Sequence, residues 1–276
     1  MKILRWMLFP FAQLYALTMA IRNFMFDIGF FEQTQYPVPI IAVGNLSTGG
    51  TGKTPFVEYL IELLPKEKNI AVLSRGYGRK TTGVLFADDQ STADSIGDEP
   101  FQLFRKFGDR VLIVVAEKRR QGVDALLQHK QTPDLILLDD AYQHRWVKRD
   151  LNILLTPYAQ PFFGDWTLPT GNLRESRFEA KRADMVVVTK SPDLDPENKS
   201  GYERRIKKLA GDAVLLFSTI TYGHLLPAFD QVEGEVDEVI TLCGIANPSP
   251  FLDYVGQQFS VQDQLVFPDH HAFTHE

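Results

Sequence analysis

A glycine-rich loop that ends in a Lys-Thr pair is the part of this sequence best suited to do chemistry. The segment 44–55 has the sequence GNLSTGGTGKTP. Glycine backbone N–H groups can converge on phosphate oxygens because no Cβ obstructs them. In such a loop Lys53 reaches the terminal phosphates of a nucleotide, and the Thr54 hydroxyl ligates Mg²⁺. The loop therefore predicts a phosphate site made of Ser47, Thr48, Gly49, Gly50, Thr51, Gly52, Lys53 and Thr54.

The segments on either side of the loop agree with this prediction. Residues 38–43 are apolar, as in a buried strand, and residues 56–64 have the apolar spacing of a helix. A helix N-terminus adds its dipole and its unpaired N–H groups to an anion site. Ser47 stands where the pattern G-x-x-x-x-G-K-[ST] has its first glycine. The alternative, a glycine-rich turn that only precedes a helix, is less favoured by this order of strand, loop and helix.

An apolar segment that ends in two acids supplies a candidate metal site. Residues 135–140 have the sequence LILLDD. The carboxyl ends of parallel strands meet at one edge of a sheet, where Walker B acids contact the Mg²⁺ of a bound nucleotide. We expect Asp139 and Asp140 at this metal, with Asp139 closer to it.

Short apolar runs alternate with helical segments along most of the chain. Several of these runs lack polar alternation, as expected for strands covered on both faces. This order predicts an α/β fold with a doubly wound, mostly parallel sheet of the P-loop NTPase type. The expected strands are 69–74, 110–115, 134–138, 151–155 and 185–189, with helices at 101–107 and 120–129.

The chain is expected to have three parts. Residues 1–30 form an N-terminal helix, residues 31–210 form the P-loop domain, and residues 211–276 form a smaller α/β domain. We expect this smaller domain to be incomplete at its C-terminus. Its expected elements are strands at 239–243 and 264–267 and a helix at 250–257.

The composition limits the possible partners and compartments. The 276 residues are 44% hydrophobic and 23% charged, as in ordinary globular proteins, and the formal net charge is −6. A negative chain has no general basic field, so non-specific nucleic-acid binding is not expected. The single cysteine, Cys243, excludes an internal disulfide and suits a reducing compartment. No segment indicates an obligate protein partner.

The first thirty residues are hydrophobic and begin with basic side chains. The uncharged stretch between Arg5 and Arg22 is short for a membrane span. This pattern suggests a helix that lies in a membrane interface, while the alternative is a helix packed on the protein's own core. Pro10 is expected to interrupt the helix. On such a helix the polar side chains share one side: Lys2, Arg5, Gln13 and Asn23.

Further motifs, in their order along the chain, resemble those of a known family. They are SRGYGR at 74–79, GDEP at 97–100, DDAYQH at 139–144, GNLRES at 171–176 and DHH at 269–271. With the glycine-rich loop, this set resembles the tetraacyldisaccharide 4'-kinase family of lipid A biosynthesis, from about residue 5 to the end. The resemblance implies a kinase that transfers the γ-phosphate of ATP to the 4'-hydroxyl of a tetraacylated glucosamine disaccharide 1-phosphate. It also implies a membrane-associating N-terminal helix at the cytoplasmic face of the bacterial inner membrane.

The resemblance assigns roles to single residues. Asp98 matches the catalytic base of the family, and His270 matches a histidine that pairs with this base. Glu99 matches a metal-associated carboxylate, and Arg174 matches an arginine near the phosphates. A histidine beside an aspartate helps because an aspartate alone is a weak base. An arginine supplies a planar fork for the charge on the transferred group.

Four residues are candidates for contact with the lipid substrate. Arg75 and Arg79 follow a predicted strand on a loop suited to an anionic substrate, and Gln143 and His144 follow the Walker B pair. His144 has a simpler alternative, since it can pack and hydrogen-bond behind the metal site.

Simpler roles are also open for the residues assigned to catalysis. Asp98 can cap a helix that starts near Pro100. Arg174 and Glu175 can form a surface ion pair. His270 can be solvent-exposed, because it lies near the end of the chain.

Two residues depart from the family pattern, and two rival functions are disfavoured by single substitutions. Ala141 and Tyr142 stand where the family has glycine and phenylalanine, and an alanine resists the positive φ that glycine allows. A membrane-attached nucleotide-switch or partition-type P-loop ATPase places a lysine at the position of Thr48. A GTPase is disfavoured too, because Pro192 stands where its guanine-reading aspartate would follow Thr189 and Lys190.

Overall fold

The computed structural model describes residues 2–223, 237–245, 247–269 and 271. It divides into two compact units, Met1–Ile220 and Thr221–Glu276. The phosphate-binding loop and both carboxylates of the candidate metal site lie in the first unit.

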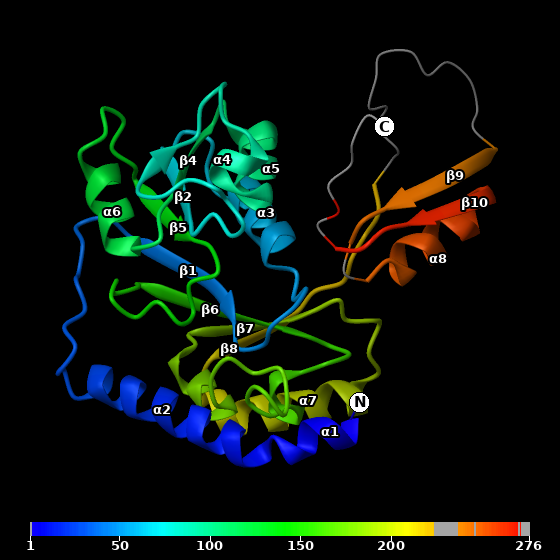
Figure 1. Ribbon diagram of the computed structural model, residues 1–276, viewed down its shortest axis with the longest axis horizontal. Coiled ribbons are helices and arrows are strands. Elements are labelled where there is room, and N and C mark those ends of the chain that lie inside the picture. The colour runs from blue at the N-terminus through cyan, green and yellow to red at the C-terminus, as the bar shows by residue number, and fades with distance from the viewer. Residues whose placement is uncertain (1, 224–236, 246, 270, 272–276) are drawn as a thin grey trace. The chain divides into compact units, whose positions relative to one another are not determined.

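The first unit is built on an eight-stranded sheet with the order β3-β4-β2-β5-β1-β6-β7-β8 (Figure 1). All neighbours are parallel except the edge strand β3, which is antiparallel to β4. Strands β2 to β5 lie on one side of the central strand β1 and β6 to β8 on the other, so the predicted doubly wound α/β fold is confirmed. The strands are β1 (Ile40–Asn45), β2 (Ile70–Ser74), β3 (Leu85–Phe86), β4 (Val111–Val115), β5 (Leu135–Leu138), β6 (Leu151–Pro157), β7 (Met185–Thr189) and β8 (Val214–Phe217).

Helices cover both faces of this sheet. They are α3 (Lys53–Leu63), α4 (Ala93–Ile96), α5 (Asp98–Phe107), α6 (Arg119–Leu127) and α7 (Pro196–Ala210), with 3₁₀ turns η1 (Phe162–Gly164) and η2 (Arg177–Arg182). Successive strand residues point to opposite faces. On β1, Val43 therefore packs in a cluster with Val57 of α3 and Leu103 of α5, whereas Ala42 packs in a second cluster with Val123 of α6. Two apolar faces explain why the strand sequences lack polar alternation.

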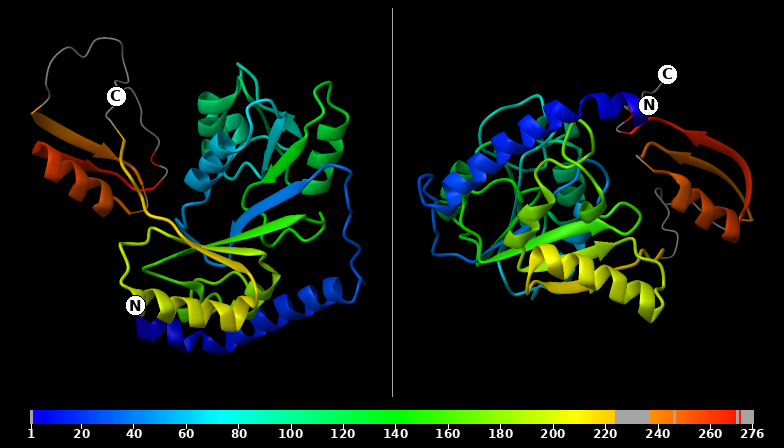
Figure 2. Two further views of the ribbon diagram at one scale, coloured as in Figure 1. Left: turned by 180° about the vertical axis from the view of Figure 1, so that it is seen from behind. Right: turned by 90° about the horizontal axis from the view of Figure 1, so that it is seen from below.

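Two helices, α1 (Lys2–Met7) and α2 (Phe9–Asp27), precede the sheet and run along the first unit (Figure 2). The break between them falls at Leu8, and Pro10 lies in the first turn of α2, where proline is tolerated. Pro10 thus lies just after the interruption that the sequence predicted. Among the described residues, no helix is long and apolar enough to cross a membrane.

The second unit contains a β-α-β arrangement. Strands β9 (Glu238–Cys243) and β10 (Ser260–Val266) are parallel and are joined through helix α8 (Ser249–Gln258). Cys243 is buried, as expected for a core thiol. The expected boundary at residue 210 comes too early, because β8 after it pairs with β7 and completes the large sheet. The two units divide at Ile220 instead.

Candidate active site

The phosphate-binding loop joins β1 to α3 with the geometry that anion binding requires. Gly49 and Gly52 have φ values of 100° and 84°, in the left-handed region that favours glycine. Gly52 is the N-cap of α3, and the helix begins at Lys53 rather than at the expected Phe56. The unpaired N–H groups and the positive dipole end of α3 therefore follow the glycines directly.

Side chains from β1 and from the end of β7 hold this loop in place. The Asn45 side chain donates to the Thr51 hydroxyl at 2.7 Å, and the Thr189 hydroxyl donates to the Thr51 carbonyl at 2.8 Å. The Lys190 ammonium donates to the Gly50 carbonyl at 2.9 Å. Thr189 and Lys190, which suggested the start of a guanine-reading loop, thus support the loop itself.

The first part of the loop pairs with the segment that precedes Arg174, more than 120 residues later in the sequence. Ser47 forms a bridge with Leu173, and the Thr48 N–H donates to the Asn172 carbonyl at 2.8 Å. The Arg174 N–H donates to the Leu46 carbonyl at 2.7 Å. Ser47 and Thr48 therefore hold the segment before Arg174 against the loop in this structure.

Asp140 joins the two cations of the site. Its carboxylate lies 3.6 Å from the Lys53 ammonium and accepts two hydrogen bonds from the Arg174 guanidinium, at 2.9 and 3.0 Å. Burial acts to raise the pKa of Asp140, but the charges of Lys53 and Arg174 outweigh it and hold that pKa below its ordinary value. A strand, a helix and a distant loop thus converge on one carboxylate.

Asp139 is buried beside this cluster and fits a cation site. One carboxylate oxygen accepts from the Ser74 hydroxyl at 3.3 Å, and the other is buried without a hydrogen-bond partner in the described structure. Burial, helped by the charges of Glu99 and Asp140, raises the pKa of Asp139 to about 6. A cation bound to the unpaired carboxylate oxygen would offset the free-energy cost of burying the charge.

The small number of protein groups around Asp139 suits Mg²⁺ better than a metal ion whose ligands all come from the protein. Among the described residues, no three His, Cys, Asp or Glu side chains are grouped to hold a metal. Mg²⁺ commonly takes only one or two carboxylates and completes its shell with water and substrate phosphates. Asp139 and the Thr54 hydroxyl, in the first turn of α3, are the protein groups expected at such an ion, and Glu99 is near enough to affect Asp139.

The raised pKa of Asp139 predicts a pH-dependent stability difference. The folded protein holds this proton more tightly than the unfolded chain, so its stability falls as pH rises from about 4 to 6. A shift from 3.8 to about 6 corresponds to roughly 3 kcal/mol at neutral pH. In Mg²⁺-free buffer, Asp139→Asn should unfold at a higher temperature than wild type at pH 7.5, with a smaller gap at pH 5. The exposed control Asp109→Asn should show no such gap.

The loops after β2 and before α5 approach each other near these acids. Gly97 is the N-cap of α5, and a side chain there would contact the Tyr77 carbonyl at 2.8 Å. Asp98 is exposed in the first helical turn, and Glu99 is half-buried. Asp98 is therefore not the N-cap that the simpler interpretation required. A negative charge in the first turn still interacts favourably with the helix dipole.

Of the two arginines predicted for the substrate, only Arg75 is exposed. The Arg79 side chain pairs with Glu117 and donates to the Gly83 carbonyl at 2.6 Å, so that it is largely buried. Its guanidinium closes the loop between β2 and β3. The prediction of a substrate role for Arg79 is corrected for this reason.

Gln143 and His144 lie behind the acids. The Gln143 amide donates to the Asn45 carbonyl at 2.9 Å. Burial, together with the nearby charge of Arg119, lowers the pKa of His144 to about 3, so this imidazole is neutral at physiological pH. Ala141 does not take the positive φ that glycine would allow at this position. Asp140 takes it instead, at 45°, and aspartate tolerates that region better than most residues.

Arg119 is a buried residue of the site that sequence reasoning missed. Its guanidinium donates to the Asp139 carbonyl at 3.1 Å and to the Ala116 carbonyl at 2.7 Å. Burial lowers its pKa to about 10, so it remains a cation at neutral pH. A lone arginine at the start of a helix gives no local signal of this position.

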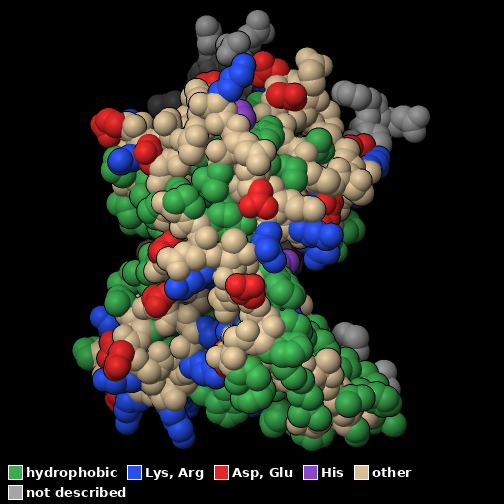
Figure 3. All heavy atoms as spheres, turned by 90° about the vertical axis from the view of Figure 1, so that its left-hand side faces the viewer, with side chains coloured by type: hydrophobic (Ala, Val, Ile, Leu, Met, Phe, Trp, Pro, Cys, Tyr) green, Lys and Arg blue, Asp and Glu red, His purple; other side chains and the backbone are tan. Residues whose placement is uncertain are grey.

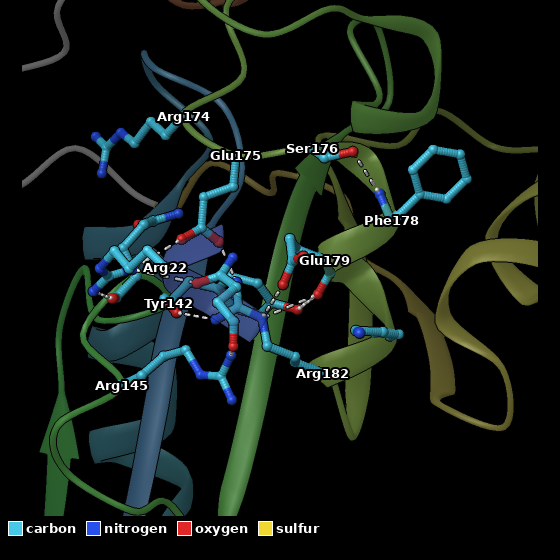
Figure 4. A network of polar contacts seen from close by, with 12 residues as sticks. Arg22, Tyr142, Arg145, Arg174, Glu175, Ser176, Phe178, Glu179 and Arg182 are labelled. Carbon is cyan, nitrogen blue, oxygen red and sulfur yellow. Dashed lines mark hydrogen bonds and ion pairs between the residues drawn. The ribbon is translucent and has the colours of Figure 1, made fainter. Parts of the chain in front are cut away.

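Arg174 and Glu175 do not form the surface ion pair that was considered. Figure 4 shows their side chains pointing in different directions. Glu175 is fully buried and pairs with Arg182 and, at 3.5 Å, with Arg22 of α2. Its neighbour Arg174 is left to face Asp140. His270, the expected partner of the base, lies outside the described residues.

Comparison with known proteins finds relatives that match nearly the whole chain. A family model described as tetraacyldisaccharide-1-P 4'-kinase matches residues 4–276. The tetraacyldisaccharide 4'-kinase of Flavobacterium johnsoniae is 47% identical over 278 residues, which cover 99% of this chain and 81% of the relative. That of Bacteroides thetaiotaomicron is 42% identical over 290 residues, covering 99% and 76%.

A solved structure has the same fold. It is the "apo" form of LpxK from Aquifex aeolicus in complex with ATP, 34% identical, with a TM-score of 0.77 over 99% of this chain and 85% of that chain. The family match and the identity to the curated relatives both extend over nearly the whole chain. This chain therefore belongs to the tetraacyldisaccharide-1-P 4'-kinase family.

Proposed function

We propose that this chain transfers the γ-phosphate of ATP to the 4'-hydroxyl of a tetraacyl glucosamine disaccharide 1-phosphate, a step of lipid A biosynthesis. The observation that carries the proposal is the convergence of Lys53 and Arg174 on Asp140 at the end of the phosphate-binding loop. Phosphoryl transfer depends on positioning and on charge stabilisation more than on covalent chemistry, and this cluster supplies both. The names of the relatives give the substrate.

The described residues divide the work of phosphate transfer. The loop 49–54 holds the β- and γ-phosphates through backbone N–H groups and the Lys53 ammonium. Arg174, released from Asp140 in part by the incoming phosphates, stabilises the charge on the transferred group. Asp139 and Thr54 would hold Mg²⁺, which would supply positive charge beside the phosphates when bound.

Asp98 is the proposed base, with Glu99 as a second carboxylate near the metal. The substrate hydroxyl oxygen forms a bond to the γ-phosphorus while its proton passes to the Asp98 carboxylate. The bond between the γ-phosphorus and the β–γ bridging oxygen breaks, and ADP leaves with that oxygen. Arg75, exposed on the loop after β2, is the remaining arginine of its motif for the anionic substrate.

A direct assay separates this function from a nucleotide switch. ATP turnover is measured with and without the disaccharide lipid, and the lipid product is checked for a new phosphate. A kinase consumes ATP only with the acceptor, in equal amounts with product. Turnover that is independent of the lipid would favour the switch-type ATPase.

We also propose that α1 and α2 lie on the membrane at its cytoplasmic face. Their exposed apolar side chains recur every three or four residues, as on one face of a helix. Figure 3 shows hydrophobic side chains gathered at the lower right, where these helices lie. A contiguous exposed apolar patch marks an interaction site, and an interfacial helix buries such a face among lipid headgroups and acyl chains. The residues are Met7, Phe11, Leu14, Leu17, Ile21, Phe24 and Ile28.

Charges placed on this face should release the protein from lipid. Burying a leucine side chain is worth about 1.5–3 kcal/mol, so Leu14→Asp with Leu17→Asp should weaken vesicle binding by at least about 100-fold. Co-sedimentation with vesicles of anionic phospholipid measures the change. Leu63→Asp, which alters an equally exposed leucine of α3, is the matched control and should bind as wild type does. Unchanged binding of the double variant would contradict the membrane proposal.

A further inference from the structure

Three polar side chains of the N-terminal helices face the protein and reach segments of the active site. They are Arg5 of α1 and Tyr15 and Arg22 of α2. Each is only partly buried, and each donates to a backbone carbonyl far away in the sequence. The opposite, apolar side of the same helices is exposed.

Arg5 contacts the segment that pairs with the phosphate-binding loop. Its guanidinium donates to the carbonyls of Pro169 and Gly171, at 3.2 and 2.6 Å, and to the Asn172 side chain at 3.0 Å. The Asn172 carbonyl in turn accepts from the Thr48 N–H. In this chain of hydrogen bonds, Asn172 alone lies between Arg5 of α1 and Thr48 of the phosphate-binding loop.

Tyr15 contacts the backbone of Arg174, whose guanidinium faces Asp140. Its hydroxyl donates to the Arg174 carbonyl at 2.7 Å. The same residue is fixed on its other side by its N–H, which donates to the Leu46 carbonyl. With both backbone groups held, the Arg174 guanidinium is directed at Asp140.

Arg22 contacts the segment that follows the Walker B acids. It donates to the Gln143 carbonyl at 2.8 Å and pairs with the buried Glu175 at 3.5 Å. The Gln143 side chain donates to the Asn45 carbonyl, and the Asn45 side chain donates to Thr51 in the phosphate-binding loop. These hydrogen bonds link α2 to the end of β1.

We infer that α1 and α2 are a positioning element for catalysis, through which contact of their apolar face with a lipid surface sets the backbone of the active site. The inference rests on the proposed function and adds a regulatory role to the helices. A displacement of about 1 Å at reacting groups can cost 10²-fold in rate, so a shift of the helices transmitted through these three contacts would change turnover. Arg5, Tyr15 and Arg22 are positioning residues, since they act through other groups.

The test compares Tyr15→Phe with wild type on a short-acyl, water-soluble disaccharide 1-phosphate, with and without anionic phospholipid vesicles. Vesicles should raise the wild-type kcat several-fold. Tyr15→Phe should lose most of this activation and lower kcat about 10-fold, with unchanged ATP affinity, vesicle binding and Tm, because only one hydrogen bond is removed. Arg5→Gln should behave in the same way. Tyr59→Phe, at an exposed tyrosine of α3, is the matched control.

A second measurement does not depend on the reaction. Amide hydrogen exchange of residues 46–48 and 172–174 should slow when vesicles bind the wild type, and slow less in Tyr15→Phe. No change in exchange, or a wild-type kcat that vesicles do not alter, would overturn the inference and leave the kinase assignment intact. A loss of activity in Tyr15→Phe that follows its Tm would also overturn it. Absent phosphate transfer by the wild type would instead refute the proposed function, while hydrogen exchange still decides the inference.

Discussion

Replacing Asp98 by asparagine is expected to lower kcat by about 10²–10⁴-fold, the usual contribution of a general base. The change keeps the shape of the side chain and removes its ability to accept the proton of the sugar hydroxyl. ATP affinity should change little, because the phosphates are held by the loop 49–54 and not by the first turn of α5. The measurement is steady-state transfer to the disaccharide lipid, together with ATP binding to the same variant.

The control for this prediction is Asp94→Asn. Asp94 is an exposed aspartate four residues earlier, in α4, and pairs with Lys80 at 2.7 Å. This variant should retain wild-type kcat. An equal loss of ATP affinity in Asp98→Asn would show that Asp98 supports the nucleotide site, and an undiminished kcat would assign the base to another residue.

Local sequence was sufficient to predict the framework of the site. Apolar runs of strand length identified the parallel sheet, because a strand covered on both faces carries apolar side chains at successive positions. The positions of Lys53, Asp139 and Asp140 followed, since a parallel sheet brings the carboxyl ends of β1 and β5 to one edge. Both elements carry their chemistry in contiguous residues.

Pairings between distant charges could not be predicted in this way. Arg75 and Arg79 lie on one loop, yet only the fold shows that Arg79 forms an ion pair with Glu117. Glu175 follows Arg174 directly, but its partners come from α2 and η2. An arginine can pair with any acid within reach, so its sequence neighbours carry little information about its partner.

The N-terminal helices show how a correct pattern can have an unexpected consequence. The spacing of polar and apolar side chains suggested a helix in a membrane interface, with a helix packed on the protein's own core as the alternative. In the structure part of the polar side meets the protein, where Asn23 is buried and Arg22 reaches Gln143. Amphipathic spacing predicts two faces but does not say what each face meets.

Replacing Arg174 is expected to give the second large loss of activity. An arginine that stabilises the charge of a transferred phosphoryl group is worth about 10³–10⁵-fold in kcat, so Arg174→Gln should lower kcat by at least about 10³-fold. Arg174→Lys should recover only a small part of it, because lysine keeps the charge without the planar guanidinium, whose Nη1 now donates to both oxygens of Asp140. Single-turnover transfer with saturating ATP measures the chemical step directly.

Arg204→Gln, at an exposed arginine of α7, is the matched control and should leave kcat unchanged. Asp140 keeps Lys53 as a partner in Arg174→Gln, so the variant should still fold and bind ATP. The KM for each substrate identifies the step at which Arg174 acts. A raised KM for the lipid with an unchanged kcat would place Arg174 in substrate binding, and it would contradict a role in stabilising the transferred phosphate.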